Sequence, residues 1–226
     1  MITEAELNGM KPKNLGNYFA DDFRPIIYRP FEGRYIDAMP RLRADNRRPM
    51  TAKDIAEKRV EVLKSKDANL INAWVNHYYD TSSGVAYFGN EIKIIPNCEI
   101  LANIDSDAKL KNGALILTPE QYKSLEGKVL NRDELKLQAW LTKQEAKEHP
   151  VWKELLGDAL NPYTDAIFKF GKEKYDIDNL MGIWIASAQK EPTLRSWFFS
   201  NLDRRSVING LSNLDYGGAR LVGVPE

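Results

Sequence analysis

The stretch GVAYFGNEIKII, residues 84–95, decides the fold class because it predicts an antiparallel β-hairpin. Two β-prone runs, 84–88 and 91–95, are separated by Gly89 and Asn90, a pair typical of a two-residue hairpin turn. Further strands are predicted at 26–30, 34–36, 98–101, 114–117, 181–186 and 219–224. The sequence therefore predicts an α+β fold with a central, mainly antiparallel sheet flanked by four to six helices. Because helices and strands are interleaved, the topology stays open and permits some parallel pairing.

Helix caps place most of the predicted helices between these strands. Thr51 is a favourable N-cap for one helix, and Asp67 is expected to cap a second. Thr118, followed by proline at the first helical position, begins a third. Residues 142–157 predict a helix interrupted at 149–150, another helix starts at Asn161, and residues 192–202 predict an amphipathic helix.

The composition is that of a globular protein of one large or two small domains. Among 226 residues, 43% are hydrophobic, and 32 basic side chains balance 32 acidic ones. This neutral balance argues against generic polyanion binding, which depends on excess positive charge. The expected organisation is an irregular N-terminal arm with a short hairpin over 1–50 and an α+β domain over 51–226, with a subdivision near residue 127.

The chain shows no signal for secretion or for membrane insertion. Its first residues carry acids where a secretory signal needs basic residues, and no apolar run approaches the roughly 18 residues that span a bilayer. The single cysteine, Cys98, cannot form an internal disulfide. We therefore expect a soluble, cytoplasmic protein without a membrane partner.

Metal and cofactor chemistry find little support in the sequence. Cys98, His77 and His149 are too far apart in sequence for the short ligand spacing of a zinc site. Cys98 has no neighbouring histidine or lysine, which predicts a buried, inert thiol. We expect no metal and no cofactor.

One segment, NHYYDTSSG at residues 76–84, contains the residue types of a hydrolase site. His77 would act as base, Asp80 as the group that orients it, and Ser82 or Ser83 as nucleophile. The alternative is structural, because Asp, Thr and Ser at this point also suit the end of a helix and the start of a turn. The structural interpretation is favoured, so an enzyme is the less expected outcome.

Arginines are concentrated between residues 24 and 48. Seven of them lie there without a single lysine: Arg24, Arg29, Arg34, Arg41, Arg43, Arg47 and Arg48. Aromatic residues alternate with some of these arginines, and Trp197, Phe198 and Phe199 precede Arg204 and Arg205. Such mixtures suit single-stranded nucleic acid, a protein-interaction surface, or a core whose aromatic edges are covered by arginines. The exposed part of the N-terminal cluster is expected at residues 41–49.

Residues 26–36, IIYRPFEGRYI, resemble a signature of single-chain restriction–modification enzymes. The signature, YRPFD-x-R-(W/Y)-x-Y, lies near the end of the methyltransferase part, just before DNA target recognition. Tyr28, Arg29, Pro30, Phe31, Arg34 and Tyr35 match it, whereas Glu32 replaces the usual aspartate and Asp37 replaces a tyrosine. The methyltransferase's own catalytic and cofactor-binding motifs are absent. The resemblance therefore implies an association with DNA and no methyltransferase activity.

Three functional hypotheses follow from the sequence. The first is a non-catalytic module that binds DNA or RNA through an arginine-rich surface, comprising Arg41, Arg43, Arg47 and Arg48 and extending to Arg204 and Arg205. The second is a protein-interaction or assembly subunit of a larger complex, whose proline-broken N-terminal arm wraps a protein partner. The third is a hydrolase that uses His77 and Asp80. The sequence does not specify the substrate, the partner or the oligomeric state.

Overall fold

The computed structural model describes residues 27–202, 205–218 and 220–226. Twelve strands in these residues form one sheet, and its longest path runs β1-β12-β3-β10-β11-β9-β8. The strands of this path are β1 (Arg29–Glu32), β12 (Arg220–Pro225), β3 (Tyr79–Gly89), β10 (Gln189–Phe199), β11 (Ser206–Asn209), β9 (Met181–Trp184) and β8 (Trp140–Leu141). The remaining strands are β2 (Arg47–Pro49), β4 (Glu91–Ile95), β5 (Leu110–Lys111), β6 (Ala114–Ile116) and β7 (Lys128–Asn131).

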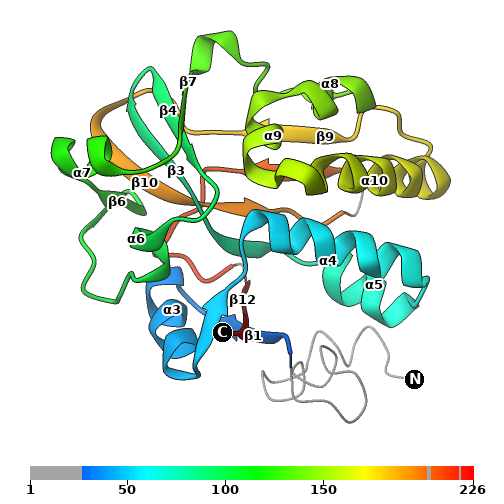
Figure 1. The fold of residues 1–226 in the computed structure, drawn as a ribbon, viewed down its shortest axis with the longest axis horizontal. Helices are drawn as coiled ribbons and strands as arrows, with labels where there is room; N and C mark the ends of the chain where they lie inside the picture. Colours follow the sequence, from blue (N-terminus) through cyan, green and yellow to red (C-terminus); the bar gives the residue numbers. More distant parts are fainter. Residues whose placement is uncertain (1–26, 203–204, 219) are drawn as a thin grey trace.

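The helices form two groups (Figure 1). One group contains α4 (Ala52–Ser65), α5 (Ala68–Val75), α8 (Lys143–Glu148), α9 (Pro150–Leu156) and α10 (Leu160–Tyr175). The other contains α3 (Tyr35–Ala44), α6 (Glu99–Ala102) and α7 (Pro119–Ser124), and the short 3₁₀ turns η2 (Arg132–Glu134) and η3 (Gly157–Ala159) complete the described elements. Five of these helices have seven or more residues. The predicted α+β class with a mainly antiparallel sheet is confirmed.

Strands β3 and β10 form the centre of the sheet. Each is 11 residues long, and they pair antiparallel with Phe198 opposite Asp80 and Leu194 opposite Ala86. The hairpin that the sequence predicts is present, since β3 continues into β4 through Gly89 and Asn90. Gly89 has φ +59°, a left-handed conformation that glycine adopts without steric cost.

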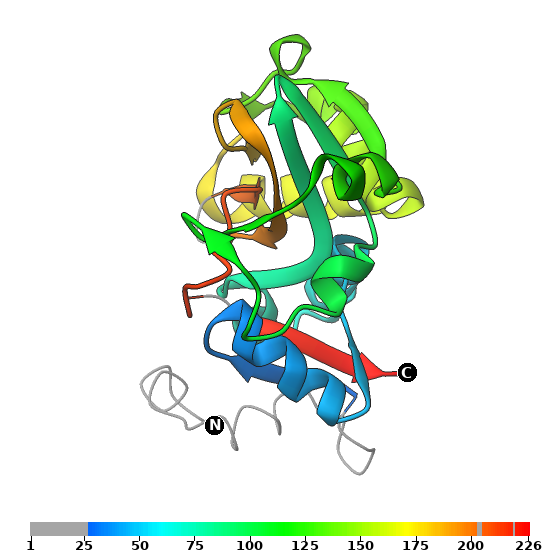
Figure 2. The same ribbon diagram turned by 90° about the vertical axis from the view of Figure 1, so that its left-hand side faces the viewer.

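Strand β12 lies between β1 and the start of β3. It pairs antiparallel with β1 and β2 but parallel with β3. Helix α3 packs against β1, β2 and β12 (Figure 2). Two segments from opposite ends of the described chain thus complete the same edge of the sheet.

The central strands are buried on both faces, because a separate hydrophobic core covers each face. The first core contains Val85 and Trp197 together with residues of α4, α9 and α10. The second core contains Ala86 and Leu194 together with residues of α3 and α6. Since alternate residues of β3 enter different cores, nine consecutive residues of this strand, 79–87, are buried.

The predicted caps Thr51, Asp67 and Thr118 are confirmed, whereas Asn161 does not start a helix, because α10 begins at Leu160 and contains it. The Thr51 hydroxyl accepts a hydrogen bond from the Asp54 amide, and the Asp54 carboxylate accepts one from the Thr51 amide. Asp67 caps α5, while Thr118 and Thr142 form capping boxes at α7 and α8. Each cap satisfies backbone amides that have no partner within their helix.

Several predicted elements are wrong. Residues 192–202 were expected to be helical, but most of this segment lies in β10, and residues 98–101, expected as a strand, contribute to α6. The amphipathic spacing of 192–202 is misleading because β10 has apolar neighbours on both faces. Residues 34–36 do not form the second strand of a hairpin either, because Tyr35 and Ile36 begin α3 and β1 pairs with β12 instead.

The start of β3 corrects the interpretation of residues 80–83. They were expected to end a helix and begin a turn, yet they lie inside the strand. Their polar side chains are satisfied within the sheet: the Thr81 hydroxyl donates to the Trp197 carbonyl over 2.7 Å, and the Ser196 hydroxyl donates to the Thr81 carbonyl over 2.8 Å. Cys98 is buried as predicted, and burial raises its pKa to about 11.

The domain division stays a prediction. Residues 29–49 form β1, α3 and β2, and both strands belong to the same sheet as the later strands. Most of the predicted N-terminal arm, residues 1–26, lies outside the described residues. Within the described residues, no helix combines the length and apolar character needed to cross a membrane.

Candidate functional site

Several arginines of the N-terminal cluster form ion pairs with acidic side chains of the same chain. Asp45 receives hydrogen bonds from Arg29 at 2.6 Å and from Arg47 at 2.7 Å, and Asp54 receives one from Arg48 at 2.8 Å. Arg34 bridges two further acids, Asp37 and Asp215. Each of these arginines therefore has a nearby acid, as the close spacing of acids in the sequence suggests.

Two arginines of the cluster bind carbonyl groups on different neighbours. Arg43 donates to the Ala102 and Ile104 carbonyls at the end of α6, at 2.9 and 3.2 Å. Arg41 donates to the Glu32 carbonyl and to the Asp37 carbonyl of its own helix. These contacts orient the two side chains toward different parts of the fold.

Arg205 lies far along the sheet from this cluster. Its guanidinium is 4.3 Å from the ring centroid of Trp140, in β8, whereas α3 packs at β1 and β12. Since β1 and β8 are the two ends of the sheet path, Arg205 does not extend the surface of Arg41, Arg43, Arg47 and Arg48. Arg24 and Arg204 lie outside the described residues. Nucleic-acid binding through these arginines stays a prediction.

The residues of the predicted hydrolase do not form a hydrogen-bonded set. The Asp80 carboxylate accepts a hydrogen bond from Ser212, and the Ser82 hydroxyl donates to the Met50 carbonyl at 3.5 Å. In the described residues the His77 ring makes no hydrogen bond. Burial, together with the charges of Arg220 and Arg59, lowers the pKa of His77 to about 4, so its imidazole is neutral at pH 7. A hydrolytic role for His77, Asp80 and Ser82 gains no support from these contacts.

Asp80 instead lies in a depression that the sequence did not indicate. We call it the aromatic depression; its volume is about 380 Å³. It is lined by Tyr78, Asp80, Phe198, Leu211, Ser212, Asn213, Tyr216 and Gly218. The start of β3, the end of β10 and the loop between β11 and β12 supply these residues.

The rim of the aromatic depression is apolar and exposed. Tyr78 is 45% exposed and Tyr216 is 69% exposed, and Leu211 is also exposed. Phe198 is half-buried beside Tyr78, with ring centroids 6.3 Å apart. Large side chains that gather at one exposed place are typical of a contact surface, whereas scattered ones are not informative.

The floor of the aromatic depression is a buried polar pair. Asp80 is 4% exposed, and its Oδ1 accepts a hydrogen bond of 2.9 Å from the Ser212 hydroxyl. Burial raises the pKa of Asp80 to about 7, although the hydrogen bond from Ser212 opposes the shift. A carboxyl group whose pKa is raised by burial inside a depression is a feature of functional sites.

The loop at residues 210–218 is held in place by backbone hydrogen bonds. The amides of Gly210 and Leu214 donate to the Trp184 and Gly113 carbonyls, at 2.8 and 2.9 Å. Arg195 of β10 donates to the Ser212 carbonyl at 2.8 Å. Leu214 is fully buried. The loop therefore presents Ser212 and Tyr216 from a fixed position, as a binding loop on a rigid scaffold does.

Sequence reasoning overlooked this site because its parts are distant in the chain. Asp80 was identified, but with the wrong partner, and Phe198 was noted only as one of three adjacent aromatic residues. Only the pairing of β3 with β10 and the return of the chain at β12 bring these segments together.

The described residues do not gather the donors of a metal centre. No group of three or more His, Cys, Asp or Glu side chains in them could hold an ion. Calcium in proteins takes about 6 to 8 oxygen ligands, often from several carboxylates. The aromatic depression offers one carboxylate, Asp80, and its donor set does not fit such an ion.

Comparison with solved structures identifies the architecture. A Nanoarchaeota chain, reported as "Accommodation of massive sequence variation in Nanoarchaeota by the C-type lectin fold", superposes with a TM-score of 0.63. The alignment covers 87% of this chain and 97% of that one. The fold is C-type lectin-like. At 20% sequence identity, this likeness concerns the fold alone. No protein-family model matches the sequence, and no curated protein matches it.

Proposed function

We propose that this protein is a ligand-binding protein that recognises a polyhydroxylated molecule, such as a saccharide, in the aromatic depression. The observation that carries this proposal is the arrangement of exposed Tyr78 and Tyr216 around the buried pair of Asp80 and Ser212. The proposal concerns binding alone.

The aromatic rim suits the apolar face of a sugar ring. Tyrosine offers a large flat surface together with a hydroxyl group, and such side chains are enriched at binding surfaces. Tyr78, Phe198 and Tyr216 lie at one depression but come from three segments of the chain. A ring-shaped ligand placed among them would lose contact with water on its apolar face.

The polar floor suits the hydroxyl groups of the same ligand. Asp80 offers carboxyl oxygens, and Ser212 offers a hydroxyl that both donates and accepts hydrogen bonds. A few convergent polar groups inside a mainly apolar depression are the usual composition of a small-molecule site. Because both side chains are buried, a ligand that failed to bond with them would leave them poorly solvated.

The C-type lectin-like fold supports the proposal, since the fold takes its name from sugar-binding proteins. The Nanoarchaeota structure is reported as one in which this fold accommodates massive sequence variation. Applied to this chain, that description leads us to expect that the fold tolerates substitution at the exposed rim, at Tyr78, Leu211 and Tyr216. The fold should tolerate substitution of the buried Leu214 poorly.

The experiment is a glycan array probed with the purified protein, followed by calorimetric titration of any saccharide that binds. Tyr78→Ala and Tyr216→Ala should each weaken binding roughly tenfold or more, which corresponds to about 1.4 kcal/mol. Phe88→Ala is the matched control, since Phe88 is an exposed aromatic residue outside the depression. We expect it to change the affinity less than about twofold.

Two outcomes would contradict this proposal. One is the absence of binding to any saccharide on the array, and the other is a bound saccharide whose affinity is unchanged in both tyrosine variants. Circular dichroism of each variant confirms that the fold is retained.

The other functions predicted from the sequence stay predictions. The contacts of Arg47 with Asp45 and of Arg48 with Asp54 would compete with phosphate groups, so nucleic-acid binding has less support than ligand binding. A protein partner and a cytoplasmic location likewise rest on the sequence alone.

A further inference from the structure

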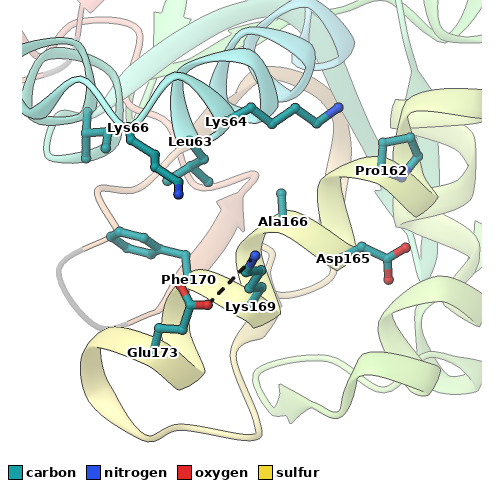
Figure 3. A pocket seen from close by; sticks show the side chains of 10 residues that line it. Leu63, Lys64, Lys66, Pro162, Asp165, Ala166, Lys169, Phe170 and Glu173 are labelled. Carbon is teal, nitrogen blue, oxygen red and sulfur yellow. Dashed lines mark ion pairs between the residues drawn. The ribbon is translucent and has the colours of Figure 1, made fainter.

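A second cavity lies between α4 and α5 on one side and α10 on the other, outside the aromatic depression. Its volume is about 700 Å³ (Figure 3). Helix α4 ends at Ser65, the chain turns at Lys66, and α5 begins at Ala68. The middle of α10 passes opposite this turn. We call this cavity, lined by Leu63, Ile71, Ala166 and Phe170 and by Lys64, Lys66 and Lys169, the lysine groove.

The floor of the lysine groove is apolar. Leu63, Ile71, Ala166 and Phe170 come from three helices and pack on the first core while remaining partly exposed. Further covering of these side chains would remove apolar surface from water, which is favourable. The volume lies in the range of small-molecule sites, which are mostly lined by hydrophobic groups.

The rim of the lysine groove is positively charged. In Figure 3, Lys66 points into the gap from the turn after α4, and Lys169 points into it from α10. Lys64 and Lys66 form no ion pair with another described residue. The two acids of the lining have lysine partners: Glu173 is 3.8 Å from Lys169. Asp165 is 2.8 Å from both Lys143 and Lys147. Three lysines and two acids thus line the groove, and one positive charge remains in excess beside the apolar floor.

The backbone of Lys66 adds an independent observation. Lys66 ends α4 in the left-handed conformation, with φ +59°. Glycine is the usual residue at this position because it has no Cβ. A lysine there is uncommon, so replacing it by glycine should not strain the backbone.

We propose that the lysine groove binds an amphiphilic anion, a molecule with an apolar chain or ring and one carboxylate or sulfonate group. The apolar part would cover Leu63, Ile71 and Phe170. The anionic group would lie between Lys66 and Lys169, and Lys64 adds positive charge at the rim. This site is separate from the aromatic depression, so the proposal is independent of saccharide binding there.

The experiment is calorimetric titration of the full-length protein with decanoate at low salt. Decanol, which has the same chain without charge, and acetate, which has the charge without the chain, are the comparison probes. We expect decanoate to bind at least tenfold more tightly than decanol, and acetate to show no binding. The affinity for decanoate should fall as salt is added, because salt screens exposed lysines. Equal affinities for decanoate and decanol, or no binding of decanoate, would overturn the proposal.

Variants of the rim locate the binding. The double variant Lys64→Gln, Lys66→Gln should weaken decanoate binding at least tenfold and leave decanol unaffected. Lys66→Gly should also weaken decanoate binding, and it should fold well because glycine suits the backbone there. Lys128→Gln is the control, since Lys128 is an exposed lysine of β7 outside the groove. If both rim variants bind decanoate like the unmodified protein, the lysine groove is not the site.

Discussion

At the scale of single residues, Asp80 is the group with the clearest physical consequence. Its carboxyl is buried where β3 begins, at the floor of the aromatic depression. Burial disfavours the charged form and raises the pKa to about 7. In the unfolded chain the same group has an ordinary pKa near 3.8. The proton balance of Asp80 therefore differs between the folded and unfolded states throughout the mildly acidic range.

This difference fixes the direction of the pH dependence. Between about pH 4 and pH 7, folded Asp80 keeps its proton while the unfolded chain has lost it. Its contribution to the free energy of unfolding then falls by roughly 1.4 kcal/mol per pH unit as pH rises. His77 acts in the opposite direction, because its pKa is lowered to about 4 and stability rises with pH between about 4 and 6.5. The two effects oppose each other in the unmodified protein.

We predict that Asp80→Asn removes only the Asp80 contribution. Asparagine stays neutral and can still accept the hydrogen bond from Ser212. Relative to the unmodified protein, the free energy of unfolding of the variant should rise steadily from pH 4 to pH 7 and then level off. Urea denaturation at several pH values measures this difference. A difference that does not change with pH would show that folded Asp80 titrates normally.

At the scale of elements, one buried arginine connects two helices to the sheet. Arg59 of α4 is fully buried and donates to the Trp74 carbonyl of α5 at 3.0 Å and to the Ser200 carbonyl at 2.7 Å. A third hydrogen bond, of 3.2 Å, reaches the His77 carbonyl. Its guanidinium also lies 5.2 Å from the ring centroid of Phe199. Arg59 thus holds together the ends of α5 and β10.

We predict that Arg59→Ala lowers the free energy of unfolding by about 3 kcal/mol or more. The reason is that three carbonyl groups lose a donor, and each buried polar group left unpaired costs about 1–3 kcal/mol. Arg41→Ala is the control, since Arg41 is exposed and should cost less than about 1 kcal/mol. Urea denaturation measures both, and Arg59→Lys serves if the alanine variant does not fold. A loss below about 1 kcal/mol for Arg59→Ala would contradict this role.

The elements also show what a sequence can and cannot specify here. Helices α4, α5, α7 and α8 were predicted because their signals are local: each has a capping residue at its start. Strand β10 was mistaken for a helix because Leu194 and Trp197 enter different cores, which removes the alternation of a one-sided strand. The sequence alone did not show why residue 84 of β3 is a glycine. In the fold, a Cβ there would lie 3.1 Å from Cys98 and Leu194.

The candidate site was harder to predict than the fold for the same physical reason. Asp80 and Ser212 are 132 positions apart, and no local pattern links them. The arginine cluster was predicted as a binding surface because its members are close together in sequence. In the fold, these arginines bind acids and carbonyl groups of the same chain. The predicted sites therefore consisted mostly of residues close together in sequence. The residues of the aromatic depression are distant in sequence and are brought together by strand pairing.

At the scale of the whole molecule, β12 makes the C-type lectin-like sheet continuous between β1 and β3. Leu221 enters the second core and Val222 the first, so the strand is anchored on both faces. We predict that the backbone amides of β12 exchange hydrogen as slowly as those of β3 and β10. Hydrogen exchange followed by mass spectrometry measures this. Markedly faster exchange in β12 would mean that the strand opens separately from the central sheet.

Strand β12 is synthesised long after β1, the strand with which it pairs. Glu32 of β1 and Arg220 of β12 form an ion pair of 3.0 Å although 188 residues separate them. A ribosome adding roughly 5–20 residues per second needs between about 9 and 38 s to cover that interval. Throughout it, β1 lacks the strand with which it pairs, and an unpaired edge invites association with other nascent chains. Slow codons between residues 209 and 220 would lengthen this exposure, so the yield of folded protein should depend on codon choice there.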